Sequence, residues 1–265
     1  MSNTRKGVKI MGRIIAVANQ KGGVGKTTTA INLSSCLAAL GKKVLSVDMD
    51  PQGNMTSGLG IDKNNVEHTI YDLMIGEIGI EDVICKEAIE NLDVLPSNVD
   101  LSAVEIELIG VENKEFIVHN EVEKVRDNYD FIIIDCPPSL STLTINAMTT
   151  ADTVLVPIQC EYYALEGLSQ LIHTIELVKS RLNPNLEMEG VVFTMYDART
   201  NLSLQVVENV KDNLHQNIYK TIIPRNIRLA EAPSHGLPIN LYDPKSTGAE
   251  SYMMLAEEVI NKGEE

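Results

Sequence analysis

The chain has 265 residues, with 22 Lys and Arg against 37 Asp and Glu, so its formal net charge is −15 at pH 7. That charge has the wrong sign for an evident nucleic-acid-binding protein. The four cysteines lack the Cys-Xaa-Xaa-Cys spacing of a zinc site, and they do not form the pattern of a secreted disulfide framework. No apolar stretch has transmembrane length and no signal-peptide core is present, so we expect a cytoplasmic protein without a membrane anchor.

Residues 1–12 precede the first apolar run and carry Arg5, Lys6 and Lys9. Two interpretations are open: a basic arm that touches DNA, or a loose tail. We favour the tail, because short polar termini are usually poorly ordered. The predicted domain organisation is therefore a tail over 1–12 and one domain over 13–265.

Strand-like apolar runs alternate with helical periods along the rest of the chain, and no linker or repeat interrupts them. This alternation predicts an α/β fold, a single doubly wound domain with a mostly parallel central sheet and helices on both faces. Helical spacing of Leu, Ile and Ala occurs at Thr28–Leu40 and Leu165–Leu182. The predicted strands lie near Arg13–Ala18, Lys43–Val47, Leu92–Leu95, Phe131–Ile134, Thr153–Pro157, Val191–Met195 and Tyr219–Ile223.

A glycine-rich loop follows the first predicted strand and precedes the first predicted helix, which is the context of a phosphate-binding loop. Its glycines allow backbone N–H groups to approach a polyphosphate, and the helix start adds its positive dipole end. Lys26 would reach the terminal phosphates and the Thr27 hydroxyl would bind Mg²⁺. The candidate nucleotide-binding residues are Lys21, Gly22, Gly23, Val24, Gly25, Lys26, Thr27 and Thr28.

Two further strands end in acids. After Lys43–Val47 come Asp48 and Asp50, two residues apart, so both side chains project to one side of the strand. After the run Phe131–Ile134 comes Asp135, as in a Walker B segment, where it would hold Mg²⁺ through water. At the C-terminal ends of parallel strands these acids would face the ligand crevice.

The loop, with its additional leading lysine Lys21, resembles the deviant Walker A loop of the ParA/MinD ATPases. The resemblance implies a P-loop NTPase fold and an ATP-sandwich homodimer, in which Lys21 reaches the partner subunit's nucleotide. It also implies that Lys21, Lys26 and Asp50 are catalytic. Asp50 would position the attacking water, and Asp48 would support the Mg²⁺ hydration shell or a lysine.

Segments along nearly the whole chain resemble the small chromosomal and plasmid partitioning ParA (Soj-like) proteins. Ile222–Ser234 is one of them, and there Pro224, Arg225 and Asn226 would pack on the adenine. Pro157–Leu168 and Thr194–Thr200 are two others. The resemblance implies a slow, partner-stimulated ATPase that binds ATP/ADP and Mg²⁺ and acts in chromosome or plasmid partitioning.

In that family the ATP-bound dimer binds double-stranded DNA without sequence preference, and a ParB-like centromere-binding partner stimulates hydrolysis. The location would then be cytoplasmic and nucleoid-associated. From Asp62 to Asp130 there are eighteen acids and five bases, and these acids could form a dock for the basic partner or simply solvated helix faces. From Arg181 to Lys245 the signs balance, with seven of each.

The balanced segment supplies the candidate DNA-binding residues Arg199, Arg228 and Lys220. Each of these residues could instead have an ordinary structural or solvated role. Arg228, for example, is spaced to pair with Glu231 on one helix. Two other functions remain open. One is a MinD-like cell-division positioning ATPase, although acids lie near the C-terminus where an anionic bilayer would repel them. The other is a metabolic ligase of the dethiobiotin-synthetase type, for which no small-molecule constellation is evident.

Overall fold

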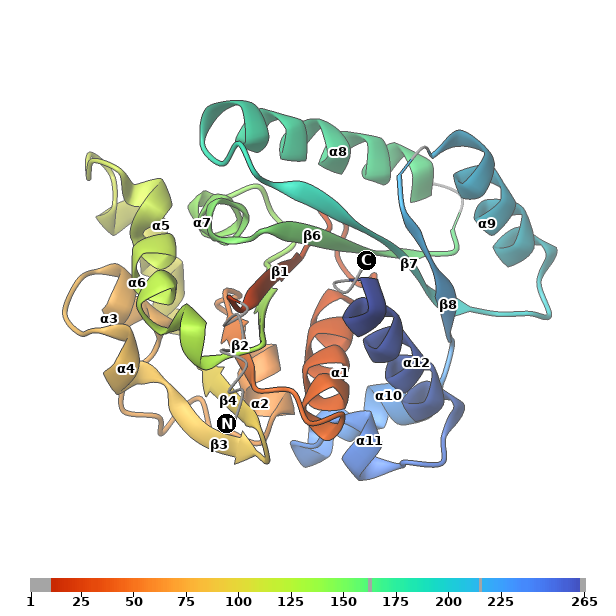
Figure 1. Cartoon of the computed structure of the whole chain (residues 1–265), viewed down its shortest axis with the longest axis horizontal. Coiled ribbons are helices and arrows are strands. Elements are labelled where there is room, and N and C mark those ends of the chain that lie inside the picture. The colour runs from red at the N-terminus through yellow and green to blue at the C-terminus, as the bar shows by residue number, and fades with distance from the viewer. Residues whose placement is uncertain (1–10, 162–163, 215, 263–265) are drawn as a thin grey trace, which may run out of the picture.

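The computed structural model describes residues 11–161, 164–214 and 216–262. Within these ranges the strands form one eight-stranded sheet in the order β3-β4-β2-β5-β1-β6-β7-β8 (Figure 1). Every neighbouring pair is parallel except β3 and β4, which are antiparallel. The strands are β1 (Arg13–Val17), β2 (Val44–Asp48), β3 (Cys85–Ile89), β4 (Leu92–Leu95), β5 (Phe131–Asp135), β6 (Thr153–Gln159), β7 (Glu187–Tyr196) and β8 (Ile218–Pro224).

Helices cover both faces of the sheet (Figure 1). The α-helices are α1 (Lys26–Ala39), α2 (Asn54–Gly58), α3 (Ile70–Met74), α4 (Ile80–Val83), α5 (Val104–Glu107), α6 (Ile117–Val125), α7 (Thr142–Thr150), α8 (Ala164–Arg181), α9 (Asn201–Asn213), α10 (Ile227–Glu231), α11 (Ile239–Tyr242) and α12 (Thr247–Lys262). Short 3₁₀ turns are η1 (Val99–Ala103), η2 (Lys114–Phe116), η3 (Arg126–Asn128) and η4 (Ala232–His235).

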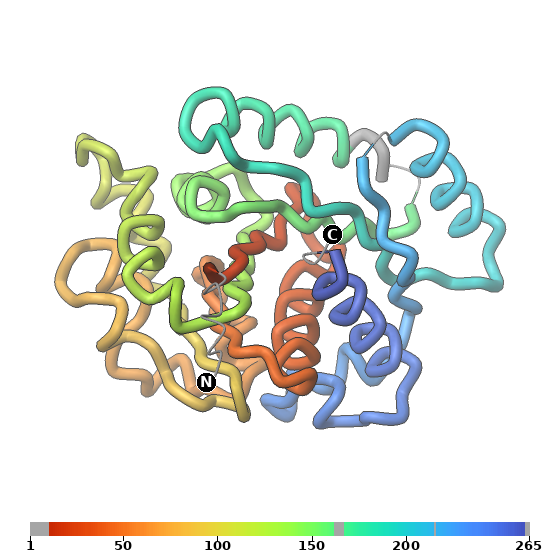
Figure 2. Tube along the Cα trace, in the orientation of Figure 1, coloured from red at the N-terminus to blue at the C-terminus, as the bar shows by residue number. Residues whose placement is uncertain are grey.

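The central strands are apolar on both faces, as expected for a parallel sheet between two helical layers. Alternate residues of β1 enter two different cores: Ile14 and Ala16 pack with α6, α7 and α8, whereas Ile15 and Val17 pack with α1 and α12. The helices α1 and α12 are far apart in sequence but lie side by side (Figure 2). Burial on both faces therefore fixes the register of the middle strands.

The prediction of a mostly parallel α/β sheet with helices on both faces is confirmed, and all seven predicted strands are present. The sequence analysis missed β3. This strand is an edge strand with partly exposed residues, and it is interrupted by a positive φ of 50° at Glu87. Because such a strand lacks a long apolar run, its pattern does not distinguish it from a loop.

Candidate nucleotide-binding site

The glycine loop lies between β1 and α1, at the carboxyl end of the central strand. In the sheet, β5 and β2 follow β1 in one direction, whereas β6 and β7 follow it in the other, so the strand order reverses at β1. Ligands of open α/β sheets bind at such a switch point. Gly23 and Gly25 have φ of 75° and 89°, a region that glycine adopts without a steric penalty, and Gly25 is the N-cap of α1.

Lys26 lies inside the loop and is almost fully buried. Its Nζ donates to the carbonyl oxygen of Lys21 at 3.1 Å, so the side chain crosses back over the loop. Burial lowers the pKa of Lys26, and the Asp135 carboxylate opposes this effect. The ammonium group is therefore held where bound phosphates would complete its hydrogen bonds.

The leading lysine, Lys21, has a different environment. Its ammonium group forms an ion pair with Glu161, just beyond the end of β6, and both side chains are about two-fifths exposed. The Lys21 backbone N–H donates to the Asn19 side chain at 3.0 Å, and Asn19 donates to the carbonyl of Pro157 at 2.8 Å. In the single chain, Lys21 is thus directed toward β6 and remains accessible from outside.

Asp135, the last residue of β5, is fully buried. Neither of its carboxylate oxygens accepts a well-formed hydrogen bond within the described residues, although the Thr27 hydroxyl and the Lys26 ammonium group lie near it. Burial raises the pKa of Asp135 well above its usual range, and the neighbouring Asp48 carboxylate adds to the effect, while Thr27 and Lys26 oppose it. A buried acid without partners is costly, and a hydrated cation would satisfy it.

Asp48 pairs in register with Asp135, because β2 and β5 are neighbours. Its carboxylate is already occupied: it accepts from the backbone N–H and hydroxyl of Thr56 and from the backbone N–H of Asp50. Burial raises the pKa of Asp48 to about 6, and the hydrogen bonds from Thr56 counteract this. Asp48 therefore shapes the loop that carries Asp50, and its predicted support of Mg²⁺ stays a prediction.

The chemistry of the acid fits a bound Mg²⁺–nucleotide. Asp135 is a buried carboxylate at the carboxyl end of β5, and the glycine loop with Thr27 is at the carboxyl end of the neighbouring β1. In the described ranges, no group of three or more His, Cys, Asp or Glu could hold a metal without further ligands. Magnesium suits this arrangement, because it keeps several waters and needs only one or two protein ligands besides phosphate. The predicted ligands are Thr27 and Asp135.

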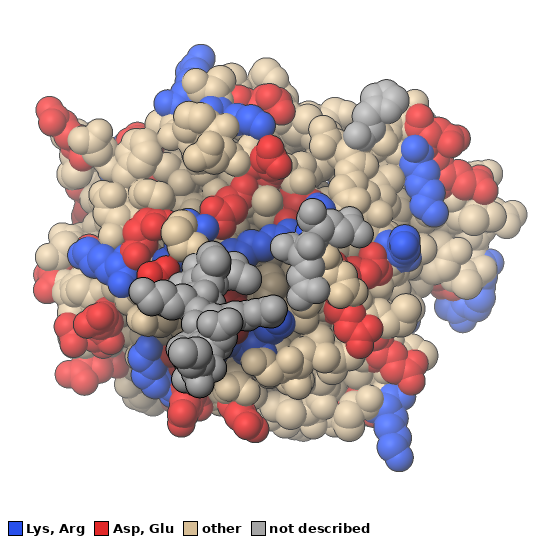
Figure 3. All heavy atoms as spheres, viewed as in Figure 1, with Lys and Arg blue, Asp and Glu red and all other residues tan. Residues whose placement is uncertain are grey.

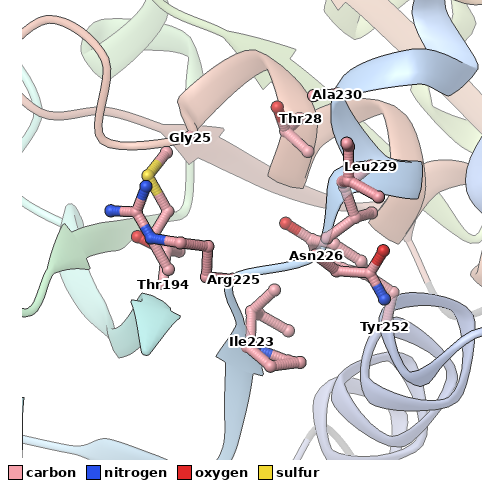
Figure 4. Close-up of a pocket in the computed structure, with 12 residues that line it drawn as sticks. Gly25, Thr28, Thr194, Ile223, Arg225, Asn226, Leu229, Ala230 and Tyr252 are labelled. Carbon is pink, nitrogen blue, oxygen red and sulfur yellow. The ribbon is translucent and has the colours of Figure 1, made fainter. Parts of the chain in front are cut away.

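A cavity of about 380 Å³ adjoins the loop (Figure 4). Its lining joins Gly25 and Thr28 of the loop to Thr194, to Tyr252 and to Pro224, the last residue of β8, with Arg225 and Asn226 after it. The Arg225 side chain extends toward Thr194, while Asn226, Leu229 and Tyr252 line the other side (Figure 4). The structure thus brings together two sequence segments that were predicted to bind one nucleotide.

Sequence reasoning missed two residues that support this site. The Thr194 hydroxyl of β7 donates to the carbonyl of Val24 at 2.8 Å, and its side chain lies within 4 Å of a Cβ placed on Gly25. The strand β7 therefore packs directly against the glycine loop. Tyr252 of α12 shares a hydrogen bond with Thr29 of α1 at 3.1 Å. Thr194 opens a segment already noted as family-like, whereas no local signal marks Tyr252.

The three predicted DNA-binding residues are not equivalent. Arg199 and Arg228 follow the carboxyl ends of the neighbouring strands β7 and β8, whereas Lys220 lies near the start of β8. Arg199 forms three hydrogen bonds with Asp197, two of them from its guanidinium group, and its side chain is 86% exposed. Arg228 pairs with Glu231, as its spacing predicted, and also with Asp243. Acidic and basic side chains are interspersed on the face shown in Figure 3.

Fold and site together define an α/β nucleotide-binding protein of the P-loop class with a second loop lysine. The family model described as an AAA domain matches residues 12–188. The chain is 58% identical over 253 residues to the sporulation initiation inhibitor protein Soj of Bacillus subtilis, covering 96% of this chain and 100% of that protein. It is 51% identical to the chromosome partitioning protein ParA of Myxococcus xanthus, covering 97% and 91%. The chain therefore belongs to the ParA/Soj family of chromosome-partitioning ATPases.

Solved structures support the same class. The cobyrinic acid a,c-diamide synthase of Mycobacterium smegmatis with a bound ATP analogue and magnesium has a TM-score of 0.85 at 34% identity, covering 96% of each chain. The cell division ATPase MinD of Pyrococcus furiosus has a TM-score of 0.80 at 30% identity, covering 95% of this chain and 100% of that one. Across the described ranges, no helix is both long and apolar enough to span a membrane.

Proposed function

We propose that this chain is an ATP-dependent dimerisation switch: its ATP-bound dimer binds DNA without sequence preference, and hydrolysis of ATP releases it. One observation carries the proposal. A phosphate-binding loop with a second, outward-accessible lysine stands next to a nucleoside-sized cavity and to a buried, unpartnered acid. A one-subunit ATPase site needs only Lys26, so Lys21 favours a site shared between two subunits.

The side chains of the site would have distinct roles in ATP binding and hydrolysis. Lys26 would neutralise charge on the terminal phosphates within the subunit, and the backbone amides of the glycine loop would bind their oxygens. Thr27 and, through water, Asp135 would hold Mg²⁺. Bound Mg²⁺ would neutralise negative charge on the β- and γ-phosphates. Asp50 would orient the water that attacks the γ-phosphorus in line with the departing ADP oxygen.

Lys21 would exchange partners on dimerisation. In the single chain Glu161 compensates its charge, and a γ-phosphate from the second subunit would offer more negative charge in a drier interface. Nucleotide and interface would then stabilise one another. Loss of the γ-phosphate would remove the attraction that draws Lys21 away from Glu161. Lys21 would then pair with Glu161 again, and the dimer would separate.

For DNA, the dimer would present two copies of the edge that carries Arg199 and Arg228. Both arginines are paired with acids in the single chain, so phosphates must compete with these carboxylates. Binding should therefore be weak for one copy and useful only for two. A ParB-like protein with a basic segment would stimulate hydrolysis, and the acid-rich stretch between Asp62 and Asp130 is its candidate dock. The protein would work in the cytoplasm, on the nucleoid.

The MinD-like alternative needs a free amphipathic face for a membrane. The apolar face of α12 is instead buried in the core through Tyr252, Leu255, Ala256 and Val259. This packing favours the partitioning function. ATP-dependent flotation with anionic vesicles would support the alternative.

The first experiment is binding to a non-specific DNA duplex, followed by fluorescence anisotropy with ATP, ADP or no nucleotide across a salt series. We expect tight binding only with ATP, falling steeply as salt rises. Equal binding in all three states would contradict the switch. Absence of binding at low salt with ATP would contradict the DNA role while leaving the ATPase assignment in place.

A further inference from the structure

The turn that carries Asp50 is tied to the neighbouring strand by a closed ring of hydrogen bonds. Thr56 of α2 donates its backbone N–H and its hydroxyl to the same oxygen of Asp48, at 2.8 and 2.7 Å. The Thr56 hydroxyl in turn accepts from the backbone N–H of Ser97 at 2.9 Å. The Ser97 hydroxyl donates to the Asp50 carbonyl at 2.8 Å, and the Asp50 N–H returns to Asp48 at 3.1 Å.

This ring lies in the interior of the protein. Asp48, Thr56 and Ser97 are fully buried, and Asp50 is 8% exposed. Water therefore cannot replace a missing hydroxyl at low cost, and loss of one group leaves a buried N–H or C=O unsatisfied. Networks of this kind fix one backbone arrangement when all their members are satisfied.

A second contact supports the same placement. Gly53 has φ of 59°, and a Cβ there would lie 2.6 Å from the carbonyl oxygen of Ser97. The backbone of the turn thus packs directly on the backbone at the end of β4. Lys63, whose Cδ would lie 2.9 Å from the same Cβ, donates to the carbonyl of Gln52. The segment from Asp50 to Gly53 is therefore held by contacts with both Ser97 and Lys63.

We propose that Thr56 and Ser97 are positioning residues for ATP hydrolysis, which hold the Asp50 turn where its carboxylate orients the attacking water. The inference rests on the proposed role of Asp50 and deepens it. Neither residue needs to touch the nucleotide. Small displacements of a group that orients a reactant lower the rate of the chemical step far more than they lower binding.

The test uses the full chain and four variants: Ser97→Ala, Thr56→Val, Thr56→Ser and Asp50→Ala. Thr56→Val keeps the shape and removes the hydroxyl, whereas Thr56→Ser keeps the hydroxyl. The matched control is Ser46→Ala, because Ser46 is fully buried on β2 and its hydroxyl has no hydrogen-bond partner in the described part of the chain. The readouts are kcat, KM for ATP, the Kd of a fluorescent ATP analogue, and dimer lifetime with ATP.

We expect Ser97→Ala and Thr56→Val to lower kcat by about ten- to a hundredfold. KM and the analogue Kd should stay within about twofold, and the ATP dimer should persist longer. Thr56→Ser should restore most of kcat, and Ser46→Ala should match the wild type. Rescue and the split between kcat and KM separate positioning from general damage to the fold. Ser97→Ala removes only one oxygen atom, so it remains informative where Thr56→Val does not fold.

Three results would overturn the inference, each in a different way. Wild-type kcat in Ser97→Ala together with an inactive Asp50→Ala would remove the positioning role and leave the proposed catalytic role of Asp50 intact. Wild-type turnover in Asp50→Ala would remove both. A parallel rise of KM and fall of kcat in Ser97→Ala and Thr56→Val, with Thr56→Ser no more active than Thr56→Val, would show a structural role only.

Discussion

At the residue scale, the site is a set of charges placed where they lack ideal partners. Lys26 is buried, Asp135 is buried and unpartnered, and Lys21 is paired only at a partly exposed position. The burial of Lys26 and Asp135 is costly for the single chain, and a Mg²⁺–nucleotide would supply the missing partners. Lys21 has Glu161 as its partner in the single chain and would exchange it for a phosphate across the dimer interface. Functional sites commonly carry this kind of cost.

Replacing Lys21 with Ala should weaken ATP-dependent dimerisation more than ATP binding, because only the contact across the interface is lost. We expect at least a tenfold higher dimer dissociation constant, equal to about 1.4 kcal/mol, with the nucleotide Kd within about threefold. Light scattering with ATP measures the dimer, and titration with a fluorescent analogue measures binding. Unchanged dimerisation would count against the shared site.

Replacing Asp135 with Asn should stabilise the nucleotide-free protein, because the burial that raises the pKa of this carboxyl also makes its charged form costly. We expect a gain of about 1 kcal/mol in the free energy of unfolding. The same variant should lose the extra stability that Mg²⁺–ADP gives the wild type, which is about 2.7 kcal/mol at a hundred times Kd. Urea unfolding with and without Mg²⁺–ADP tests both. A less stable nucleotide-free variant would contradict the account.

At the element scale, one buried acid of the sheet connects four strands to the C-terminal helix α12, in addition to the apolar packing of that helix. Glu189 of β7 is fully buried and forms an ion pair with Arg13 of β1; it also accepts from Thr153 of β6 at 2.7 Å and from Tyr219 of β8. Lys262 of α12 lies 3.4 Å from the same carboxylate. The four strands and α12 are therefore joined near the amino ends of the strands, whereas the nucleotide site lies at the carboxyl ends.

This cluster gives a pH dependence. Burial raises the pKa of Glu189, but Arg13, Tyr219 and Lys262 together outweigh it, so the pKa lies below the ordinary value of 4.5 for a glutamate. Because the pKa is lower in the folded state than in the unfolded chain, the ionised Glu189 stabilises the protein above pH 4.5. This stabilisation is lost as the pH falls through the pKa of Glu189 in the folded state. Replacing Glu189 with Gln should cost about 3 kcal/mol at pH 7.

The same replacement should also flatten the acid side of the stability profile. Urea unfolding from pH 7 down to pH 3 measures both effects. As a control, Glu187→Gln changes an exposed carboxylate on the same strand and should leave the profile unchanged. A Glu189→Gln profile with the wild-type slope below pH 4.5 would contradict the role of the cluster.

At the scale of the whole molecule, the charge distribution decides how DNA is bound. With a net charge of −15, long-range attraction to DNA is absent, so affinity must come from local contacts made twice by a dimer. Two copies of a weak DNA-binding surface are joined only in the ATP-bound dimer, so the affinity for DNA depends on the nucleotide state. A strongly basic surface would bind DNA in every nucleotide state.

Replacing Arg199 with Ala should reduce the slope of log affinity against log salt by about one for each copy that contacts a phosphate. The effect should be present only with ATP. Arg181→Ala is the control, because Arg181 is an exposed arginine at the end of α8, toward the opposite edge of the sheet. Anisotropy across a salt series measures the slope. Equal slopes for wild type and Arg199→Ala would place the DNA-binding face elsewhere.

The sequence by itself determined the fold class, seven of the eight strands of the described sheet and the identity of the nucleotide loop. These features are local: a glycine loop between a strand and a helix, and apolar runs of strand length, are readable without knowledge of contacts. The assignments of Lys21, Asp50 and Asp135 came from the same local patterns and from family resemblance. The edge strand β3 had no such pattern and was missed.

Only the tertiary structure decided which partners those residues have. The ion pair between Lys21 and Glu161 joins positions 140 residues apart in sequence. In the ring, the bonds made by Thr56 and Ser97 join positions 8 to 47 residues apart. Such contacts depend on strand order and register. Strand order follows from the packing of two separate cores, and no single segment encodes it.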